Sequence, residues 1–271
     1  MTHDALMNSI ASRFDGEPEF FAAMRQEAYF GYSETAPPSK HMNILEIGAG
    51  GCLLSAMLSA DGHTIHAVEP ISGGFAKSER LLQAVAGLNL PGLNIHRCSI
   101  EDLEATTKFD WVIAVNSFEH LPDWKAALTK TYDVLRPGGS AFVLCPNYAF
   151  PYESHYGIPI IGSKAITKHL FDRQIRSFDE NNDSAGLWNS INMISLPAVR
   201  SYCWRAGIPL RTDREISVRM MERLVKDNNF AKRQAAIAPI VGTMKFLGVD
   251  RVVSIFQPYM KLIIEKPVGA E

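Results

Sequence analysis

The stretch that most constrains the fold runs from residue 43 to residue 52 and reads NILEIGAGGC. Its first five residues are apolar apart from Asn43 and Glu46, which is typical of a short strand buried on both faces. Three of the next four residues are glycine, and a helical run begins at Cys52. A strand that ends in glycines before a helix brings bare backbone close to a ligand, as in the nucleotide sites of doubly wound α/β proteins.

A carboxylate follows at the distance that such a site requires. A second apolar run over 64–68 ends in Glu69 and Pro70, and Glu69 lies 21 positions after Gly48. In a nucleotide-binding βαβ unit, an acidic residue about 20 positions further on faces the ribose hydroxyls. The glycines alone would also fit an ordinary strand-to-helix turn, so the nucleotide site is inferred from both features together.

The order of the glycines distinguishes between nucleotides. A dinucleotide site has the pattern G-x-G-x-x-G, but Leu53 stands at the third glycine position, and Glu46 has no role in that pattern. An acid followed by glycines at every second position fits better: Glu46, Gly48 and Gly50, with Cys52 where a third glycine is usual. This segment resembles the first motif of the class I S-adenosylmethionine-dependent methyltransferases.

The resemblance continues downstream and covers residues 42–147, about 40% of the chain. Phe109-Asp110 leads into a strand that ends in the segment NSFEHL, residues 116–121. After a helix, LRPGG at 135–139 precedes another strand. The resemblance implies a methyltransferase enzyme with S-adenosylmethionine as cofactor. It also implies an α/β fold, a doubly wound Rossmann-like seven-stranded sheet that is mostly parallel with an antiparallel last strand.

The pattern of apolar runs predicts alternating strands and helices, which favours a mostly parallel sheet. The predicted core elements are strands 43–47, 64–69, 93–97, 110–116 and 140–145, and helices 52–61, 73–87 and 123–135. Four segments follow from this pattern: an N-terminal helical segment 1–39, a cofactor-binding core 40–147, a cap or substrate insertion 148–192, and a C-terminal part 193–271 that completes the sheet. The last part is predicted to contain helix 195–206, strand 210–218, a helical insertion 219–256 and strand 259–265.

Composition restricts the class of protein and its partners. Hydrophobic residues make up 46% and charged residues 21%, as in an ordinary globular protein, and a net charge of −2 gives no support for nucleic-acid binding. Four cysteines lie far apart without a C-x-x-C pair, so we expect neither a disulfide framework nor a metal site, and a reducing cytoplasmic location. The N-terminus lacks the apolar core of a signal peptide, and no apolar run of about 18 residues predicts a membrane span.

The resemblance assigns cofactor roles to several positions. It implies that Glu46 orients the glycine loop or receives the methionine ammonium through water, and that Glu69 binds the ribose. Ile100 and Glu101 are expected to frame the adenine, although the family often carries aspartate where Ser99 stands. Asn116, at the end of the fourth strand, is expected to face the methionine portion of the cofactor. The complete predicted set is Glu46, Gly48, Ala49, Gly50, Glu69, Ile100, Glu101 and Asn116.

The acceptor is expected beside the segment 146–159, PNYAFPYESHYGIP, because this proline-broken and aromatic stretch directly follows the carboxyl end of a strand. Tyr148 and Tyr156 are predicted to bind the substrate. A hydroxyl or amine acceptor must lose a proton, so His155 and His120 are candidate bases, with Glu153 as a third.

Three functions stay open at this point. The first is methyl transfer to a hydroxyl of a small molecule or glycan, with N-methylation of an amine as its alternative. The second is an NAD-dependent oxidoreductase on a similar sheet, and the third is a non-catalytic protein that keeps the cofactor pocket. The insertion 219–256 is interpreted as a helical subdomain that covers the site or makes a homodimer, or else as a surface that admits a lipid-linked substrate.

Overall fold

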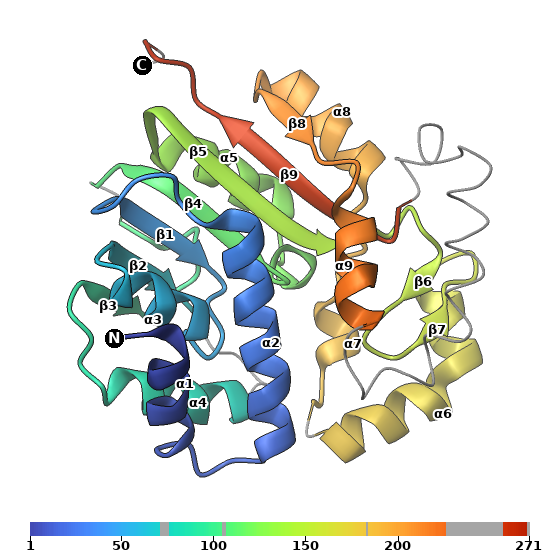
Figure 1. Ribbon diagram of the computed structural model, residues 1–271. Helices are drawn as coiled ribbons and strands as arrows, with labels where there is room; N and C mark the ends of the chain where they lie inside the picture. Colours follow the sequence, from blue (N-terminus) through green and yellow to red (C-terminus); the bar gives the residue numbers. More distant parts are fainter. Residues whose placement is uncertain (71–75, 105–106, 183, 226–256, 270–271) are drawn as a thin grey trace.

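A seven-stranded sheet forms the centre of the protein in the computed structural model, which describes residues 1–70, 76–104, 107–182, 184–225 and 257–269 (Figure 1). The strand order is β3-β2-β1-β4-β5-β9-β8. All neighbouring pairs from β3 to β5 are parallel, whereas β9 is antiparallel to both β5 and β8. The strands are β1 (Asn43–Ile47), β2 (Thr64–Val68), β3 (Leu93–His96), β4 (Phe109–Val115), β5 (Leu135–Pro146), β8 (Leu210–Thr212) and β9 (Tyr259–Glu265).

Helices cover both faces of this sheet. One face carries α1 (His3–Ala11), α2 (Pro18–Thr35), α3 (Leu53–Ala60), α4 (Ala76–Ala86) and α9 (Ile216–Val225). The other face carries α5 (Trp124–Val134) and α8 (Leu196–Ala206), and a 3-10 turn, η1 (Phe118–His120), follows β4. This layering is that of a doubly wound α/β protein, so the predicted fold class is confirmed.

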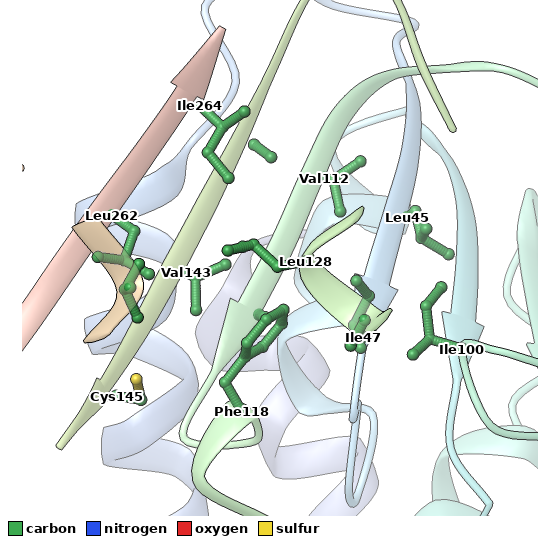
Figure 2. Packing of buried hydrophobic residues seen from close by; sticks show 14 of the residues in the cluster. Leu45, Ile47, Ile100, Val112, Phe118, Leu128, Val143, Cys145, Leu262 and Ile264 are labelled. Atoms are coloured by element: carbon green, nitrogen blue, oxygen red, sulfur yellow. The ribbon is translucent and has the colours of Figure 1, made fainter. Parts of the chain in front are cut away.

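The two faces are separated by alternation along each strand. Leu45 and Ile47 of β1 pack with Val112 of β4 in the cluster under α5 and α8, where Figure 2 shows them beside one another. Ile44 points the other way, into the cluster under α1 to α4. Because successive strand side chains point to opposite faces, Glu46 must share the face of Ile44, which is the face that α3 covers.

The centre of the sheet determines where a ligand can bind. β1 pairs with β2 on one side and with β4 on the other, and all three strands run in the same direction. Their carboxyl ends, Ile47, Val68 and Val115, therefore lie at one edge of the sheet. The strand order reverses at this point, which is where open α/β sheets hold their ligands.

A smaller layer stands at this edge (Figure 1). It consists of the hairpin β6 (Tyr152–Glu153) and β7 (Ile158–Pro159), the helix α6 (Lys164–Asn182) and the short helix α7 (Leu187–Ser190). These elements pack around a cluster of their own, which includes Tyr156, Ile175 and Trp188. We call the segment 148–192 the cap.

The structure corrects one predicted element and adjusts others. Strand 210–218 ends at Thr212, because the Asp213 carboxylate accepts the Glu215 backbone N–H at 2.8 Å and the chain then turns into α9. Strand 140–145 begins earlier, at Leu135. The predicted helical N-terminus is two helices, and α2 ends at Thr35, just before Pro37-Pro38.

Some predictions lie outside the described residues: the start of helix 73–87, and most of the insertion 219–256, of which only residues 219–225 are described, as part of α9. Among the described helices, none is both long enough and apolar enough to cross a bilayer.

Candidate functional site

A large cavity opens at the carboxyl ends of β1, β2 and β4. Its volume is about 2290 Å³, above the roughly 300–1,000 Å³ of common ligand pockets, so it has room for a nucleotide-sized ligand and a second molecule. The loop after β1 forms one end of the cavity, and the cap together with η1 forms the other. Residues of α2 line it as well, so the N-terminal helical segment contributes to the wall.

The glycine loop after β1 uses backbone conformations that most residues avoid. Gly48 has φ +68°, and a Cβ atom there would lie 2.3 Å from Cβ of Ser117. Gly50 has φ +51°, and a Cβ atom there would meet nothing within 4 Å. Cys52, where the family pattern has glycine, also adopts a left-handed φ of +58°. The two glycines therefore serve different ends: Gly48 allows close packing against η1, and Gly50 leaves open space in the cavity.

Glu69 connects this loop to the end of β2. Its Oε2 accepts a hydrogen bond from the Gly50 backbone N–H at 2.8 Å, while the N–H groups of Gly48 and Ala49 donate to the Val68 carbonyl at 2.9 and 3.2 Å. The Glu69 carboxylate also lines the cavity. Glu69, the acid predicted from the sequence spacing, thus both holds the glycine loop and lines the cavity.

Glu46 lies beneath the loop and is almost fully buried, with 4% of its surface exposed. The Ser55 hydroxyl of α3 donates a hydrogen bond to its Oε2. Burial raises the pKa of Glu46 from 4.5 to about 7. The nearby Glu69 carboxylate raises it further, whereas the hydrogen bonds from Ser55 lower it. Glu46 therefore carries an unusually basic carboxylate at the cavity floor.

Asn116 occupies the first position after β4, with a φ of +49°. Asparagine tolerates this left-handed conformation better than most residues, which explains why it ends the strand. Its Oδ1 accepts a hydrogen bond from the Tyr259 hydroxyl of β9 at 2.7 Å, so the side chain is fixed at the cavity wall. Ile100 and Glu101 lie on the wall after β3.

Three titratable side chains meet at the opposite end of the cavity. Glu119 and His120 come from η1 and His155 from the cap, and their ligand atoms all lie within 4.8 Å of one another. The rings of His120 and His155 are edge to face, with centroids 5.2 Å apart. Nδ1 of His120 contacts the Ser190 hydroxyl of α7 at 2.9 Å, and Nδ1 of His155 contacts Oε1 of Glu153 at 2.6 Å.

The environment separates the pKa values of these groups. Burial raises the pKa of Glu119 to about 8, and burial together with the neighbouring His155 lowers that of His120 to about 3. Burial also acts to lower the pKa of His155, but its hydrogen bond to Glu153 and the Glu153 charge outweigh this, so the pKa of His155 is raised. The same contact outweighs the effect of burial on Glu153 and keeps its pKa below the ordinary value. Glu153 thus makes the imidazole of His155 more basic than that of its neighbour His120.

The predicted site residues divide into two groups. All eight predicted cofactor residues line the cavity, as do His120 and His155. Glu153, Tyr148 and Tyr156 lie behind the wall instead: Tyr148 donates to Glu153, and the Tyr156 hydroxyl donates to Asp179 at 2.7 Å. The two tyrosines predicted to touch a substrate therefore hold the cap together in this structure, because the aromatic loop folds back on α6.

Other residues of the site were not predicted from the sequence. Phe20, Met24 and Glu27 of α2 line the cavity, whereas Tyr29 and Tyr32, the aromatic residues that stand out in this helix, bind Asp4 and Asp61 outside it. The aromatic residues of α2 could have indicated that this helix lines the site, but helical spacing alone does not say which of its residues face a ligand. Ser190 gave no signal, since its contact with His120 spans 70 positions.

The charge of the lining favours a cationic ligand. Among the described residues, seven carboxylates line the cavity, against three lysine or arginine side chains. The acids are Glu17, Glu19, Glu27, Glu46, Glu69, Glu101 and Asp123, and the bases are Lys77, Lys164 and Arg214. A negatively lined cleft attracts positive charge.

Comparisons with known proteins find methyltransferases among the proteins that this chain resembles. A family model described as "Methyltransferase domain" matches residues 45–141. The uncharacterized protein Rv1509 of Mycobacterium tuberculosis is 37% identical over 193 residues, which cover 71% of this chain and 66% of that protein. The human mitochondrial ubiquinone biosynthesis O-methyltransferase is 28% identical over 131 residues, which cover 48% of this chain and only 34% of that protein.

A solved structure of similar fold is phosphoethanolamine N-methyltransferase 2 of Haemonchus contortus, in complex with phosphomonomethylethanolamine and S-adenosylhomocysteine. Its TM-score is 0.52 at 14% sequence identity, and the match covers 89% of this chain and 52% of that one. At this identity the likeness concerns the fold alone.

The two glycines provide a first test. We expect Gly48→Ala to lower the free energy of unfolding by about 2–5 kcal/mol, since it adds left-handed strain and a clash with Ser117. Gly50→Ala adds only the strain and should cost about 1–2 kcal/mol. Urea denaturation of the ligand-free protein measures both losses, and equal losses would contradict the conformation of this loop.

The buried carboxylate of Glu46 provides a second test. The folded pKa of about 7 exceeds the ordinary 4.5, so the folded state keeps its proton between these values while the unfolded chain loses it. Stability is therefore lost as the pH rises from 4.5 to 7, by about 3 kcal/mol. Glu46→Gln removes this loss, so its stability relative to the wild type should rise by that amount between pH 4.5 and 7.5. A difference that does not change with pH in urea denaturation would show that Glu46 is not buried in this way.

Proposed function

Because the chain belongs to the class I S-adenosylmethionine-dependent methyltransferases, we propose that it transfers the methyl group of this cofactor to a hydroxyl of a small molecule or glycan. One observation carries the proposal: a single cavity extends from the glycine loop and Glu69 to the two histidines, His120 and His155. A cofactor held at the first end can present its methyl group to an acceptor held at the second.

The division of work follows from the chemistry of the cofactor. The methyl group on a sulfonium is already electrophilic, so the protein has to bind, orient and exclude water. Holding an acceptor in line with this carbon can contribute roughly 7–11 kcal/mol. We assign the ribose to Glu69, the adenine to Ile100 and Glu101, and the methionine portion to Asn116. The acidic lining supports this assignment, since the cofactor carries a positive sulfonium and an ammonium group.

An acceptor hydroxyl must also lose its proton. His155 is the first candidate for the base, because Glu153 holds its Nδ1 and thereby directs Nε2 away from this carboxylate. His120 stands beside it and is held through Ser190 in the same way. Glu153 acts through His155 as a positioning residue, since it lies behind the wall.

The name of the human relative favours a hydroxyl acceptor, and that of the nematode structure keeps an amine acceptor as the alternative. Leu53 and the 137–139 turn argue against an NAD-dependent oxidoreductase. A cytoplasmic location and a homodimer stay predictions from the sequence.

Methyl transfer is tested by incubating the protein with methyl-labelled S-adenosylmethionine and extracts of its host, followed by mass spectrometry of the labelled products. We expect one labelled small molecule or glycan with the methyl group on oxygen. If the protein binds S-adenosylhomocysteine but labels nothing, it is a binding protein and the proposed activity is wrong.

The ribose assignment predicts that Glu69→Ala weakens the binding of S-adenosylhomocysteine by about 1–3 kcal/mol, because a carboxylate acceptor is lost. Isothermal titration calorimetry measures this change. Glu79→Ala is the matched control, since Glu79 pairs with Arg97 outside the cavity lining. Equal affinity of wild type and Glu69→Ala would refute the assignment.

The two histidines separate the acceptor classes. With a hydroxyl acceptor, the double variant His120→Ala, His155→Ala should lose about 10²–10⁴-fold in turnover, since no imidazole is left to activate it. With an amine acceptor the loss need not occur. Turnover is measured with the labelled acceptor, and His66→Ala, which lies outside the cavity lining, serves as the control. Unchanged turnover with a hydroxyl acceptor would remove both histidines from the mechanism.

A further inference from the structure

We propose that Glu119, His120 and His155 form a binding site for a divalent transition-metal cation, with zinc as the first candidate. The three side chains come from two parts of the chain, η1 and the cap, and offer one carboxylate and two imidazoles. Their ligand atoms lie within 4.8 Å of one another, and Oε1 of Glu119 is 3.9 Å from Nε2 of His120. A small contraction would place all three ligand atoms at roughly 2.0–2.2 Å from a cation between them, which is the zinc–ligand distance in proteins.

Glu119 provides the main reason to expect a cation here. Its side chain is fully buried, and neither of its carboxylate oxygens has a hydrogen-bond partner among the described residues. A buried polar group without a partner is costly, and a buried carboxylate more so. A cation bound to these oxygens would remove that cost. An acid on the surface pays no such cost, because water solvates it.

The hydrogen bonds behind the two imidazoles fix them as ligands. The Ser190 hydroxyl donates its one hydrogen to the Leu187 carbonyl at 2.8 Å, so it can only accept from Nδ1 of His120. Nδ1 of His120 therefore carries the hydrogen, and Nε2, on the side of Glu119, carries the lone pair. Metal-binding histidines usually donate their second ring N–H to a hydrogen-bond acceptor of this kind, which fixes the tautomer and the orientation of the ring.

His155 is arranged in the same way. Its Nδ1 donates to Oε1 of Glu153, whose Oε2 accepts the Tyr156 backbone N–H at 2.8 Å. Glu153 is thus held by the cap and in turn directs the ring. A carboxylate behind a histidine fixes its tautomer and raises its basicity as a ligand.

The donor set selects the metal. Two imidazole nitrogens and one carboxylate suit zinc and other first-row transition metals, whereas magnesium and calcium prefer oxygen ligands alone. Three protein ligands leave a fourth position, as in catalytic zinc sites. His120 and His155 both line the cavity, so this position faces the region assigned to the acceptor. The sequence analysis expected no metal site because the four cysteines form no C-x-x-C pair, and it did not consider residues 119, 120 and 155 together, since they have no recognised ligand spacing.

A role for the cation at the acceptor rests on the proposed function, whereas the binding site does not. A bound cation would lower the pKa of an acceptor hydroxyl, so that its proton could pass to solvent water in place of an imidazole. Nε2 of one histidine cannot bind the cation and accept the proton at the same time. The metal-loaded protein therefore uses the histidines as ligands.

The test starts from full-length protein stripped of metal with a chelator. Calorimetric titration with zinc chloride should show one site per chain, and magnesium chloride in parallel should bind at least 100-fold more weakly. Cobalt(II) should give the visible absorption of a site with nitrogen ligands. No zinc binding, or equal binding of magnesium, would overturn the proposal.

Variants assign the ligands. His155→Ala and Glu119→Gln should each weaken zinc binding at least tenfold, while the double variant His66→Ala, His96→Ala should not, although it removes a histidine pair whose ring nitrogens are 3.0 Å apart. Circular dichroism checks that each variant folds. If Glu119→Gln does not fold, the zinc affinity of His155→Ala decides the test, since His155 is less buried than Glu119. Undiminished zinc affinity in His155→Ala would overturn the proposal. None of these readouts uses methyl transfer, so the site and the activity can fail separately.

Discussion

The attachment of the glycine loop to the end of β2 is the constraint on which the site depends. The Val68 carbonyl accepts from Gly48 and Ala49, and the Glu69 carboxylate accepts from Gly50. These bonds turn the chain away from β1 before α3 begins, and they leave the backbone facing the cavity. Without them the loop would have to close over the crevice between β1 and β4 to satisfy its N–H groups.

The opposite end of the cavity depends on the cap in a comparable way. Asn192, the last residue of the cap, donates through its side chain to the carbonyls of Phe118 and Leu121, at 2.7 and 2.9 Å. Its backbone N–H donates to the Glu119 carbonyl. The cap therefore holds the turn that carries Glu119 and His120 as well as supplying His155. This gives the acceptor end a fixed geometry despite its origin in distant segments.

The sequence was informative where the determinants are local. β1, the glycines and Glu69 follow from apolar runs and spacing within 30 residues, so they could be predicted. The start of α9 could not be predicted, because it follows from the hydrogen bond between the Asp213 carboxylate and the Glu215 N–H, which the predicted strand 210–218 did not reveal. The pairing of Ser190 with His120 and the burial of Tyr156 against α6 depend on how the cap folds, which no local pattern encodes.

The central claim is that the crevice at the carboxyl ends of β1, β2 and β4 holds the adenosine and directs the reactive carbon toward the histidines. A crystal structure of the protein with S-adenosylhomocysteine tests it most directly. The account predicts ribose hydroxyls within hydrogen-bond distance of the Glu69 carboxylate and the sulfur on the side of Asn116, facing His120 and His155. Ligand bound elsewhere, or a crevice filled by side chains, would contradict it.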